Sequence, residues 1–201
     1  FAFLATYATG QLLLGPVIDR LGSKRSLSLA VFWWSIASCL HAFGRGVGSF
    51  FAARAFLGVT EAANFPAAYK VIAEWFPRAE RSLASGFVTA GTGIGAIVAP
   101  PLIAFLIATF DALHARGLSP THGWQAAFIV PGVLGLVWVW IWKRYFHLPE
   151  HPPTIDTVER TLGMSGRVAP VATAAERRPL GQEMRAYFAR LAYWFRYRET
   201  W

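Results

Sequence analysis

The sequence SLASGFVTAGTGIGAIVAPPLIAFLIATF, residues 82–110, contains no Asp, Glu, Lys or Arg. A helix needs about 20 predominantly apolar residues to cross the hydrocarbon core of a bilayer, which is about 30 Å thick. The stretch exceeds that length, so we predict a membrane-spanning helix over residues 83–109. The composition agrees, because 15% of the residues in the chain are charged, against about 25% in soluble domains.

Four more stretches of the chain are similarly apolar. Residues 1–18, 26–44 and 117–142 again lack Asp, Glu, Lys and Arg, and residues 46–69 contain two of them. Inside lipid the backbone must satisfy its own polar groups, which favours helices. We therefore predict an all-α membrane protein whose transmembrane helices lie at about residues 1–18, 26–44, 48–75, 83–109 and 125–146.

The chain opens at Phe1 inside an apolar stretch, with no charged segment before it and no small-residue cleavage site. A secretory signal peptide has both features, so we interpret the stretch as a transmembrane helix and not as a leader. We expect the native protein to begin upstream of Phe1.

Metal-binding patterns are not apparent in the sequence. The single cysteine, Cys39, excludes a disulfide framework and a cysteine-based metal site. The histidines show no metal-binding spacing, so we expect them in loops and at the membrane interface, and we expect no cofactor. They are His41, His114, His122, His147 and His151.

The net charge of +8 is unevenly distributed along the chain. If residues 19–25 face the cytoplasm, nearly all basic loop residues fall on that side, and only Arg45 and Arg116 fall on the other. An excess of Lys and Arg in cytoplasmic loops is typical of membrane proteins. We therefore predict a multi-pass protein of the inner (plasma) membrane, embedded in the lipid bilayer. Nucleic-acid binding is disfavoured, because no soluble basic face carries the charge.

The end of the chain changes character. Residues 147–183 are rich in Pro, Thr, Ala, Glu and Arg and lack periodicity, which indicates a mobile cytoplasmic linker. In residues 184–201 apolar side chains recur at helical spacing among arginines, which predicts a basic amphipathic segment. Such a segment suits an anionic membrane surface, and packing on a further part of the protein is the alternative. The apolar positions are Met184, Phe188, Leu191 and Phe195.

A polar turn, GPVIDRLGSKR at residues 15–25, joins the first two predicted helices. Gly15 and Gly22 permit a tight turn and close helix approach. Asp19 lies at a helix end among basic residues, and such a cluster can latch neighbouring helices through charge-assisted bonds that form and break. A positive-inside loop with solvated charges is the alternative interpretation. The basic residues are Arg20, Lys24 and Arg25.

This turn matches the G-x-x-x-D-R-x-G-x-[RK]-R signature of the major facilitator superfamily, and the chain resembles that superfamily. Further motifs resemble its anion:cation symporter family and, within it, the hexuronate transporters. The resemblance implies part of the N-terminal helix bundle of such a transporter, with spans two to six and the central loop. The motifs are Arg54-x-x-x-Gly58-x-x-Glu61-Ala62-Ala63-x-x-Pro66, Glu74-Trp75-Phe76-Pro77-x-x-Glu80-Arg81-Ser82, Ala99-Pro100-Pro101-Leu102 and Trp124-Gln125-x-Ala127-Phe128-Ile129.

The resemblance also implies a function, proton-coupled symport of a hexuronate or a related sugar acid by alternating access. The partners are then a small organic anion and the lipid bilayer, with no protein partner, no cofactor and no enzymatic reaction implied. The coupling ion is the proton, with sodium as the alternative. Another organic anion, such as an aldonate or an aromatic carboxylate, is an alternative substrate.

Two ionisable residues lie inside the third predicted span. Arg54 and Glu61 are seven positions apart, two helical turns, so they share a helix face. An ionisable residue inside a membrane helix is costly and is a functional hypothesis by default. Glu61 can exchange a proton as its surroundings alternate between wet and dry, and Arg54 can pair with a substrate carboxylate or with Glu61. The resemblance implies proton coupling at Glu61 and charge balance at Arg54; a static ion pair is the alternative.

Polar residues of other predicted spans are candidates for substrate binding. Tyr7 and Gln11 are four positions apart on one face of the first span, and Asn64 lies one turn beyond Glu61. The resemblance implies that Tyr7 faces the substrate cavity, although hydrogen bonding between helices would also explain the pair. In the fourth span, Thr89 stands where hexuronate transporters commonly carry Asn, which leaves the exact substrate open.

Three other classes of protein are disfavoured. The stretch from Gly91 to Ala96, followed by Asp111, has the spacing of a dinucleotide-binding loop, but it lies inside an uncharged run with no strand before it. A membrane-embedded enzyme would need a nucleophile or metal ligands at one depth, which the sequence does not show. A non-transporting receptor on the same scaffold would not need Arg54 and Glu61.

Overall fold

The computed structural model describes residues 1–76, 80–147 and 179–196, which form helices and contain no strand. This confirms the all-α prediction for the described part of the chain. The helices are α1 (Ala2–Leu21), α2 (Ser23–His41), α3 (Val47–Glu61), α4 (Asn64–Trp75), α5 (Arg81–Ala115), α6 (Gly123–Tyr145) and α8 (Leu180–Arg196).

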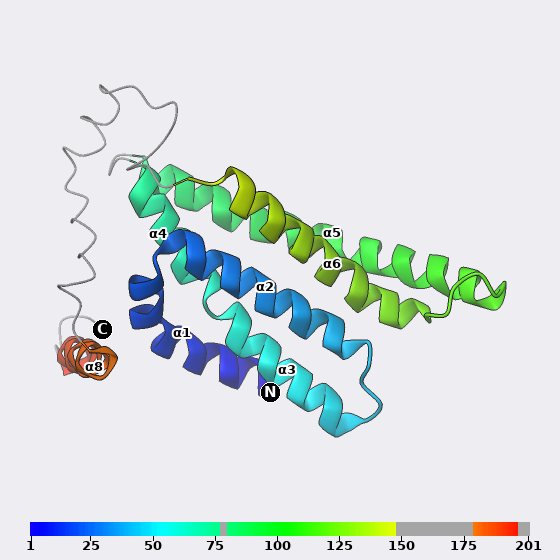
Figure 1. The fold of residues 1–201 in the computed structure, drawn as a ribbon, viewed down its shortest axis with the longest axis horizontal. Helices are drawn as coiled ribbons and strands as arrows, with labels where there is room; N and C mark the ends of the chain where they lie inside the picture. Colours follow the sequence, from blue (N-terminus) through cyan, green and yellow to red (C-terminus); the bar gives the residue numbers. More distant parts are fainter. Residues whose placement is uncertain (77–79, 148–178, 197–201) are drawn as a thin grey trace.

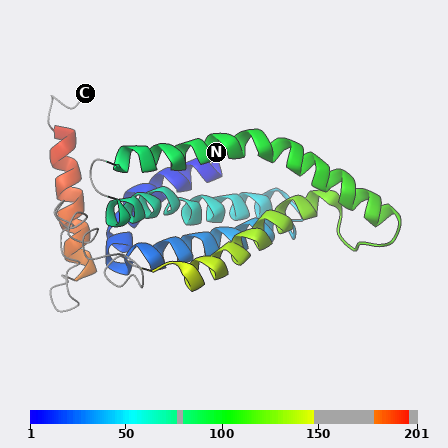
Figure 2. The same ribbon diagram turned by 90° about the horizontal axis from the view of Figure 1, so that it is seen from above.

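Helices α1 to α6 lie side by side along one long axis (Figure 1). Helix α2 packs on α6 and α3, α1 packs on α3, and α5 packs on α6. Helix α8 lies across the end of this bundle where α1 turns into α2, nearly perpendicular to the other helices (Figure 2). The predicted linker, residues 147–183, lies mostly outside the described residues, whereas α8 begins four residues before the predicted amphipathic segment.

The third predicted span, 48–75, consists of two helices. Helix α3 ends at Glu61 and α4 begins at Asn64, with a turn between them. Pro66 has no backbone N–H, and its ring clashes with the carbonyl of the residue four positions earlier, which is Ala62. The helix is therefore interrupted at Ala62, directly after the predicted proton-coupling residue.

Glycines set the distance between α1 and the helices α3 and α4. A Cβ placed on Gly10 would lie 2.7 Å from the Cβ of Ala62, too close for a real contact, and one placed on Gly58 would meet the backbone of Phe3. Small residues at helix contacts let the two backbones approach closely. Gly10 therefore holds α1 directly against the turn that separates α3 from α4.

Buried side chains pack at both ends of α2. Near the α1–α2 turn, Ile18, Leu27 and Val31 form an apolar cluster with Ala67 and Val139. At the opposite end of α2, His41 has no exposed surface; its Nδ1–H donates to the Ala37 carbonyl at 2.7 Å, and its ring stacks on Phe128 at 4.9 Å. His41 therefore lies buried at the end of a helix and not in a loop.

Helix α5 is the most exposed part of the bundle. Phe87, Ile94, Ile97 and Phe105 are between 62% and 76% exposed, and large apolar surfaces of this kind mark contact with lipid or protein. The glycines of the dinucleotide-like stretch lie within this helix and follow no strand. Within the described residues, α5 and α6 are the helices long and apolar enough to cross a membrane by themselves. That residues 1–18, 26–44 and 48–75 cross the membrane stays a prediction.

Candidate functional site

Four polar residues predicted to bind substrate or protons lie on helices that pack closely. The contact between Gly10 and Ala62 places one turn of α1 against the α3–α4 break. The four polar residues are close in sequence to Gly10 or to Ala62. They are Tyr7 and Gln11 on α1, Glu61 at the end of α3 and Asn64 at the start of α4. We call them the α1–α3 polar group.

Every member of the α1–α3 polar group is half-buried. Within the part of the chain that the structure describes, none of the four side chains forms a hydrogen bond or an ion pair. The ring of Tyr7 stacks on Phe3 at 5.5 Å between centroids, which leaves its hydroxyl for another partner. Polar groups that leave water are normally hydrogen-bonded. The group can therefore bind water, a proton or the hydroxyls of a polar ligand.

Arg54 lies on α3, about 10 Å along the helix axis from Glu61, since each residue adds about 1.5 Å. It is exposed, and among the described residues its guanidinium forms no ion pair with Glu61. Arg54 instead faces a hollow of about 940 Å³, which we call the arginine hollow. The hollow is lined by Phe1, Ala2, Phe3, Gly44, Arg45, Gly46, Val47, Phe50, Phe51, Arg54 and Trp124.

Thr89 forms its hydrogen bond within α5 and not with the α1–α3 polar group. Its hydroxyl donates to the carbonyl of Ser85 at 3.0 Å, one turn earlier in α5. The side chain is exposed on a helix that packs on α6 and α4. Among the described residues, Thr89 therefore forms no hydrogen bond with another residue that is predicted to bind substrate.

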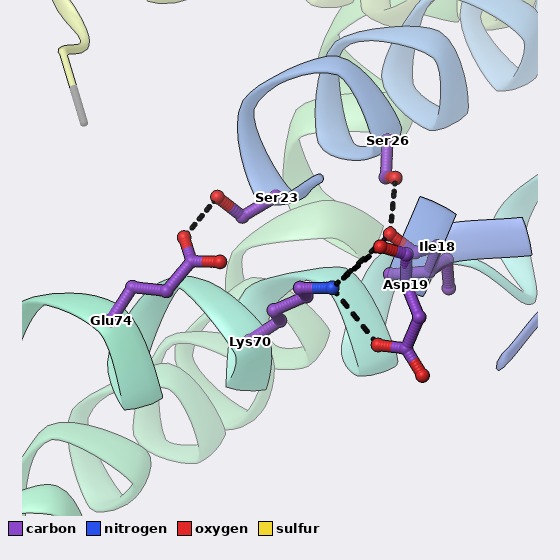
Figure 3. Close-up of polar contacts among 6 residues, drawn as sticks. All are labelled: Ile18, Asp19, Ser23, Ser26, Lys70 and Glu74. Carbon is purple, nitrogen blue, oxygen red and sulfur yellow. Dashed lines mark hydrogen bonds and ion pairs between the residues drawn. The ribbon is translucent and has the colours of Figure 1, made fainter. Parts of the chain in front are cut away.

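The predicted gating turn is held to α4 by an ion pair. Lys70 Nζ lies 2.9 Å from Asp19 Oδ1 and also donates to the carbonyl oxygens of Ile18 and Asp19, at 3.4 and 3.3 Å (Figure 3). Carbonyls at a helix C-terminus lack intrahelical donors and carry partial negative charge. Lys70 therefore caps α1 while it neutralises Asp19.

A second contact joins α4 to the start of α2. Ser23 is fully buried, and its hydroxyl donates to the Glu74 carboxylate (Figure 3). The hydroxyl of Ser26 donates to the Ile18 carbonyl at 3.3 Å. Lys70 and Glu74 are four positions apart on α4 and thus share a face. Through these two residues, one face of α4 contacts both the end of α1 and the start of α2.

The glycines of this turn have different roles. Gly22 has a φ of +77°, a left-handed conformation that glycine adopts without steric cost, and it ends α1 and begins α2. Gly15 lies inside α1, where a Cβ would be about 3.5 Å from the hydroxyl of Tyr187 on α8. Gly22 makes the turn, whereas a Cβ at Gly15 would make an ordinary van der Waals contact with α8.

Asp19 has a partner outside the turn. Lys70, 51 positions away, forms an ion pair with it, and the latching role of the cluster with Arg20, Lys24 and Arg25 stays a prediction. Arg20 is half-buried at the end of α1, and Arg25 is exposed on α2. Lys24 contributes its backbone carbonyl, which accepts from Trp142 Nε1 at 3.3 Å. The four-residue spacing of Lys70 and Glu74 is the sequence signal that could have indicated the α4 contacts.

Comparison with known proteins identifies related transporters. The chain is 34% identical over 168 residues to the galacturonate transporter of Dickeya chrysanthemi, covering 84% of this chain and 45% of that protein. It is 32% identical over 185 residues to the hexuronate transporter of Escherichia coli K12, covering 92% of this chain and 40% of that protein. A probable galactarate/D-glucarate transporter of Bacillus subtilis is 31% identical over 164 residues, covering 79% and 33%.

The chain thus spans less than half the length of each of these relatives. A family model described as Major Facilitator Superfamily matches residues 1–197, which is nearly the whole chain. The match includes the α1–α2 turn, the α1–α3 polar group and Arg54. The chain therefore belongs to the Major Facilitator Superfamily.

Proposed function

We propose that the protein containing this chain is a secondary transporter, not an enzyme, that carries a hexuronate or a related sugar acid across the inner (plasma) membrane together with a proton. The observation that carries the proposal is the α1–α3 polar group, in which Tyr7, Gln11, Glu61 and Asn64 are half-buried without a hydrogen-bonding partner among the described residues. The hydroxyls and carboxylate of a sugar acid offer complementary donors and acceptors.

Each residue has a distinct role in this proposal. Tyr7, Gln11 and Asn64 bind the hydroxyls of the substrate, and Thr89 contributes from α5 when the helices close. Glu61 accepts and releases the coupled proton. Arg54 is exposed and has no acidic partner in the described residues, so it supplies the counter-charge for the carboxylate.

The proposed transport cycle couples the polar group to the opposite end of α1. Binding of an anion and a proton leaves Glu61 uncharged and Arg54 neutralised, which lowers the cost of closing the site away from water. The Lys70–Asp19 contact then breaks or forms as α1 moves relative to α4. In transporters built from repeats the substrate site lies at the interface between them, so we expect this chain to need the remainder of its protein for transport.

A different sugar acid is the second candidate substrate. The relative from Bacillus subtilis is named for galactarate and D-glucarate, and Thr89 replaces the Asn that hexuronate transporters commonly carry. An aldonate or aromatic carboxylate belongs to the same class of proposal, because each offers a carboxylate to Arg54.

The test is uptake of labelled galacturonate by the full-length protein in cells without other hexuronate uptake. We expect accumulation that a protonophore abolishes and that replacement of sodium does not change. Competition by unlabelled galactonate, glucarate and benzoate ranks the alternative substrates. Uptake that survives the protonophore but requires sodium would make sodium the coupling ion. Absence of uptake of every sugar acid, with the protein present in the membrane, would contradict the proposal.

A further inference from the structure

Helices α2 and α6 pack side by side, and the start of α2 lies at the same end of the bundle as the end of α6 (Figure 1). The indole N–H of Trp142 on α6 donates to the backbone carbonyl of Lys24 on α2, at 3.3 Å. This hydrogen bond joins the two helix ends directly. By the charge distribution of the loops, this end lies on the cytoplasmic side. We call residues 24–25 and 138–146 the α2–α6 corner.

The α2–α6 corner contains four basic residues and no acidic one. The first residue of the four is half-buried, and the other three are exposed. Within the part of the chain that the structure describes, none of them forms an ion pair. The four residues are Lys24, Arg25, Lys143 and Arg144.

The acidic residues at this end of the bundle do not compensate the charge of the corner. Asp19 forms its ion pair with Lys70, and the carboxylate of Glu74 accepts a hydrogen bond from Ser23. Glu80 precedes α5 and forms no ion pair among the described residues. The described part of the protein therefore supplies no counter-charge to the corner, which favours an anion from outside it.

The faces of α2 and α6 that lead away from the basic residues are apolar and exposed. Leu29 and Trp33 on α2, and Trp138 and Ile141 on α6, are between 38% and 47% exposed. Large apolar side chains exposed together mark a contact with lipid or protein. Because the two helices are packed neighbours, their exposed faces offer a surface along which acyl chains can lie.

Aromatic rings mark the depth of the corner in the membrane. Trp142 stacks on Trp138, with 5.1 Å between centroids, and on Phe146, at 3.8 Å. The guanidinium carbon of Arg144 lies 5.8 Å from the centroid of the Tyr145 ring. Trp and Tyr are enriched where the membrane meets water, at the level of the lipid headgroups. The basic residues beside these rings are therefore at the depth of the lipid phosphates.

We propose that the α2–α6 corner binds the headgroup phosphate of an anionic phospholipid, whose acyl chains lie along the exposed faces of α2 and α6. Basic pockets between helices on the cytoplasmic side suit such headgroups, and each Lys or Arg near the surface raises the affinity for anionic lipid about fivefold. A zwitterionic lipid has no net charge and gains less. The inference concerns a lipid partner and does not depend on the transported substrate.

The test places the full-length protein in phosphatidylcholine bilayers and replaces a fraction of the lipid with phosphatidylglycerol whose acyl chains are brominated. Bromine quenches nearby tryptophans, and the quenching at the corner is the part that Trp142→Phe removes. Compared with brominated phosphatidylcholine, we expect the anionic lipid to be preferred about tenfold at low salt, and less at high salt, which screens exposed charges. Lys143→Gln should lower the preference about two- to fivefold, and Lys143→Arg should retain it.

Arg185 provides the matched control. It is an exposed cation of α8, which packs on α1 at the same end of the bundle, so Arg185→Gln should leave the preference unchanged. Equal quenching of the wild-type corner by the two brominated lipids would overturn the proposed site. A loss of preference in Arg185→Gln as large as in Lys143→Gln would also overturn it, because the attraction would then come from the charge of the whole surface.

Discussion

Lys70 of α4 forms an ion pair with Asp19 of α1, with 2.9 Å between Nζ and Oδ1. The same ammonium group donates to the backbone carbonyls of Ile18 and Asp19. One cation therefore neutralises the carboxylate and caps the helix that ends there. Separation of α1 from α4 requires both sets of bonds to break together, which suits a contact that switches between two states.

Replacement of Asp19 by Asn should slow transport by the full-length protein and leave substrate affinity within a few-fold. The Asp19 side chain is 77% exposed, and exposed ion pairs contribute about 0.2–1 kcal/mol to stability, so the protein should still fold. Turnover and substrate binding are measured on the same purified preparation. Lys70→Gln is the matched variant, and the double variant should be no slower than the slower single variant. Loss of expression in Asp19→Asn would favour a purely structural turn.

Replacement of Glu61 by Gln tests proton coupling. Gln resembles the permanently protonated carboxyl at nearly the same volume, and net transport driven by a proton gradient requires protonation and deprotonation in each cycle. We expect Glu61→Gln to abolish accumulation against a gradient but to retain substrate binding and exchange. The measurement pairs counterflow with uptake driven by a pH gradient in proteoliposomes.

Arg54→Ala is the comparison for that experiment. It should impair both exchange and accumulation, because the site loses the counter-charge for the anion. If Glu61→Gln still concentrates substrate in response to a pH gradient, Glu61 is not the coupling residue.

Truncation of Glu74 should destabilise the α2–α4 contact. Ser23 is fully buried and donates to the Glu74 carboxylate, and a buried donor left without an acceptor costs about 1–3 kcal/mol. We therefore expect Glu74→Ala to lower the melting temperature of the full-length protein in detergent, whereas Glu74→Gln keeps an acceptor and should lose less. Equal melting temperatures of Glu74→Ala and the wild type would show that the hydrogen bond adds no stability.

Enlargement of Gly10 should disturb the contact between α1 and the α3–α4 break. The Cβ of a larger residue would lie 2.7 Å from the Cβ of Ala62, and overpacking of this kind costs about 1–3 kcal/mol. We expect Gly10→Val to lower thermal stability and substrate binding together. Gly48→Ala, where a Cβ meets nothing within 4 Å, is the control and should bind normally. Normal binding by Gly10→Val would mean that the contact does not position the polar group.

Cysteine labelling tests the orientation of the bundle. In a Cys39→Ala background, a cysteine at Arg25 should react with an impermeant reagent only from the cytoplasmic side, and one at Leu118 only from outside. Both positions are exposed, whereas the nearby Ser23 is fully buried and unsuitable. Labelling of both positions from one side would contradict the predicted topology.

Several features could be predicted from the sequence because they depend on local physics. Uncharged runs such as residues 82–110 require helices in lipid, and the turn at residues 15–25 requires a glycine with positive φ at Gly22. Arg54 and Glu61, predicted to lie on one helix, are both on α3. The break after Glu61 was missed, because average hydropathy does not register the steric clash between Pro66 and the carbonyl of Ala62.

The sequence by itself determined the all-α architecture and the family, since apolar runs and a short motif are local properties of the chain. Only the tertiary structure decided that Asp19 pairs with Lys70 and that Ser23 bonds Glu74, because those contacts depend on how α4 packs against the α1–α2 turn. It also decided that Arg45 and Arg54 face one hollow. The physical reason is the same in each case: charges more than a few residues apart meet only where the packing of apolar faces and glycines brings their helices together.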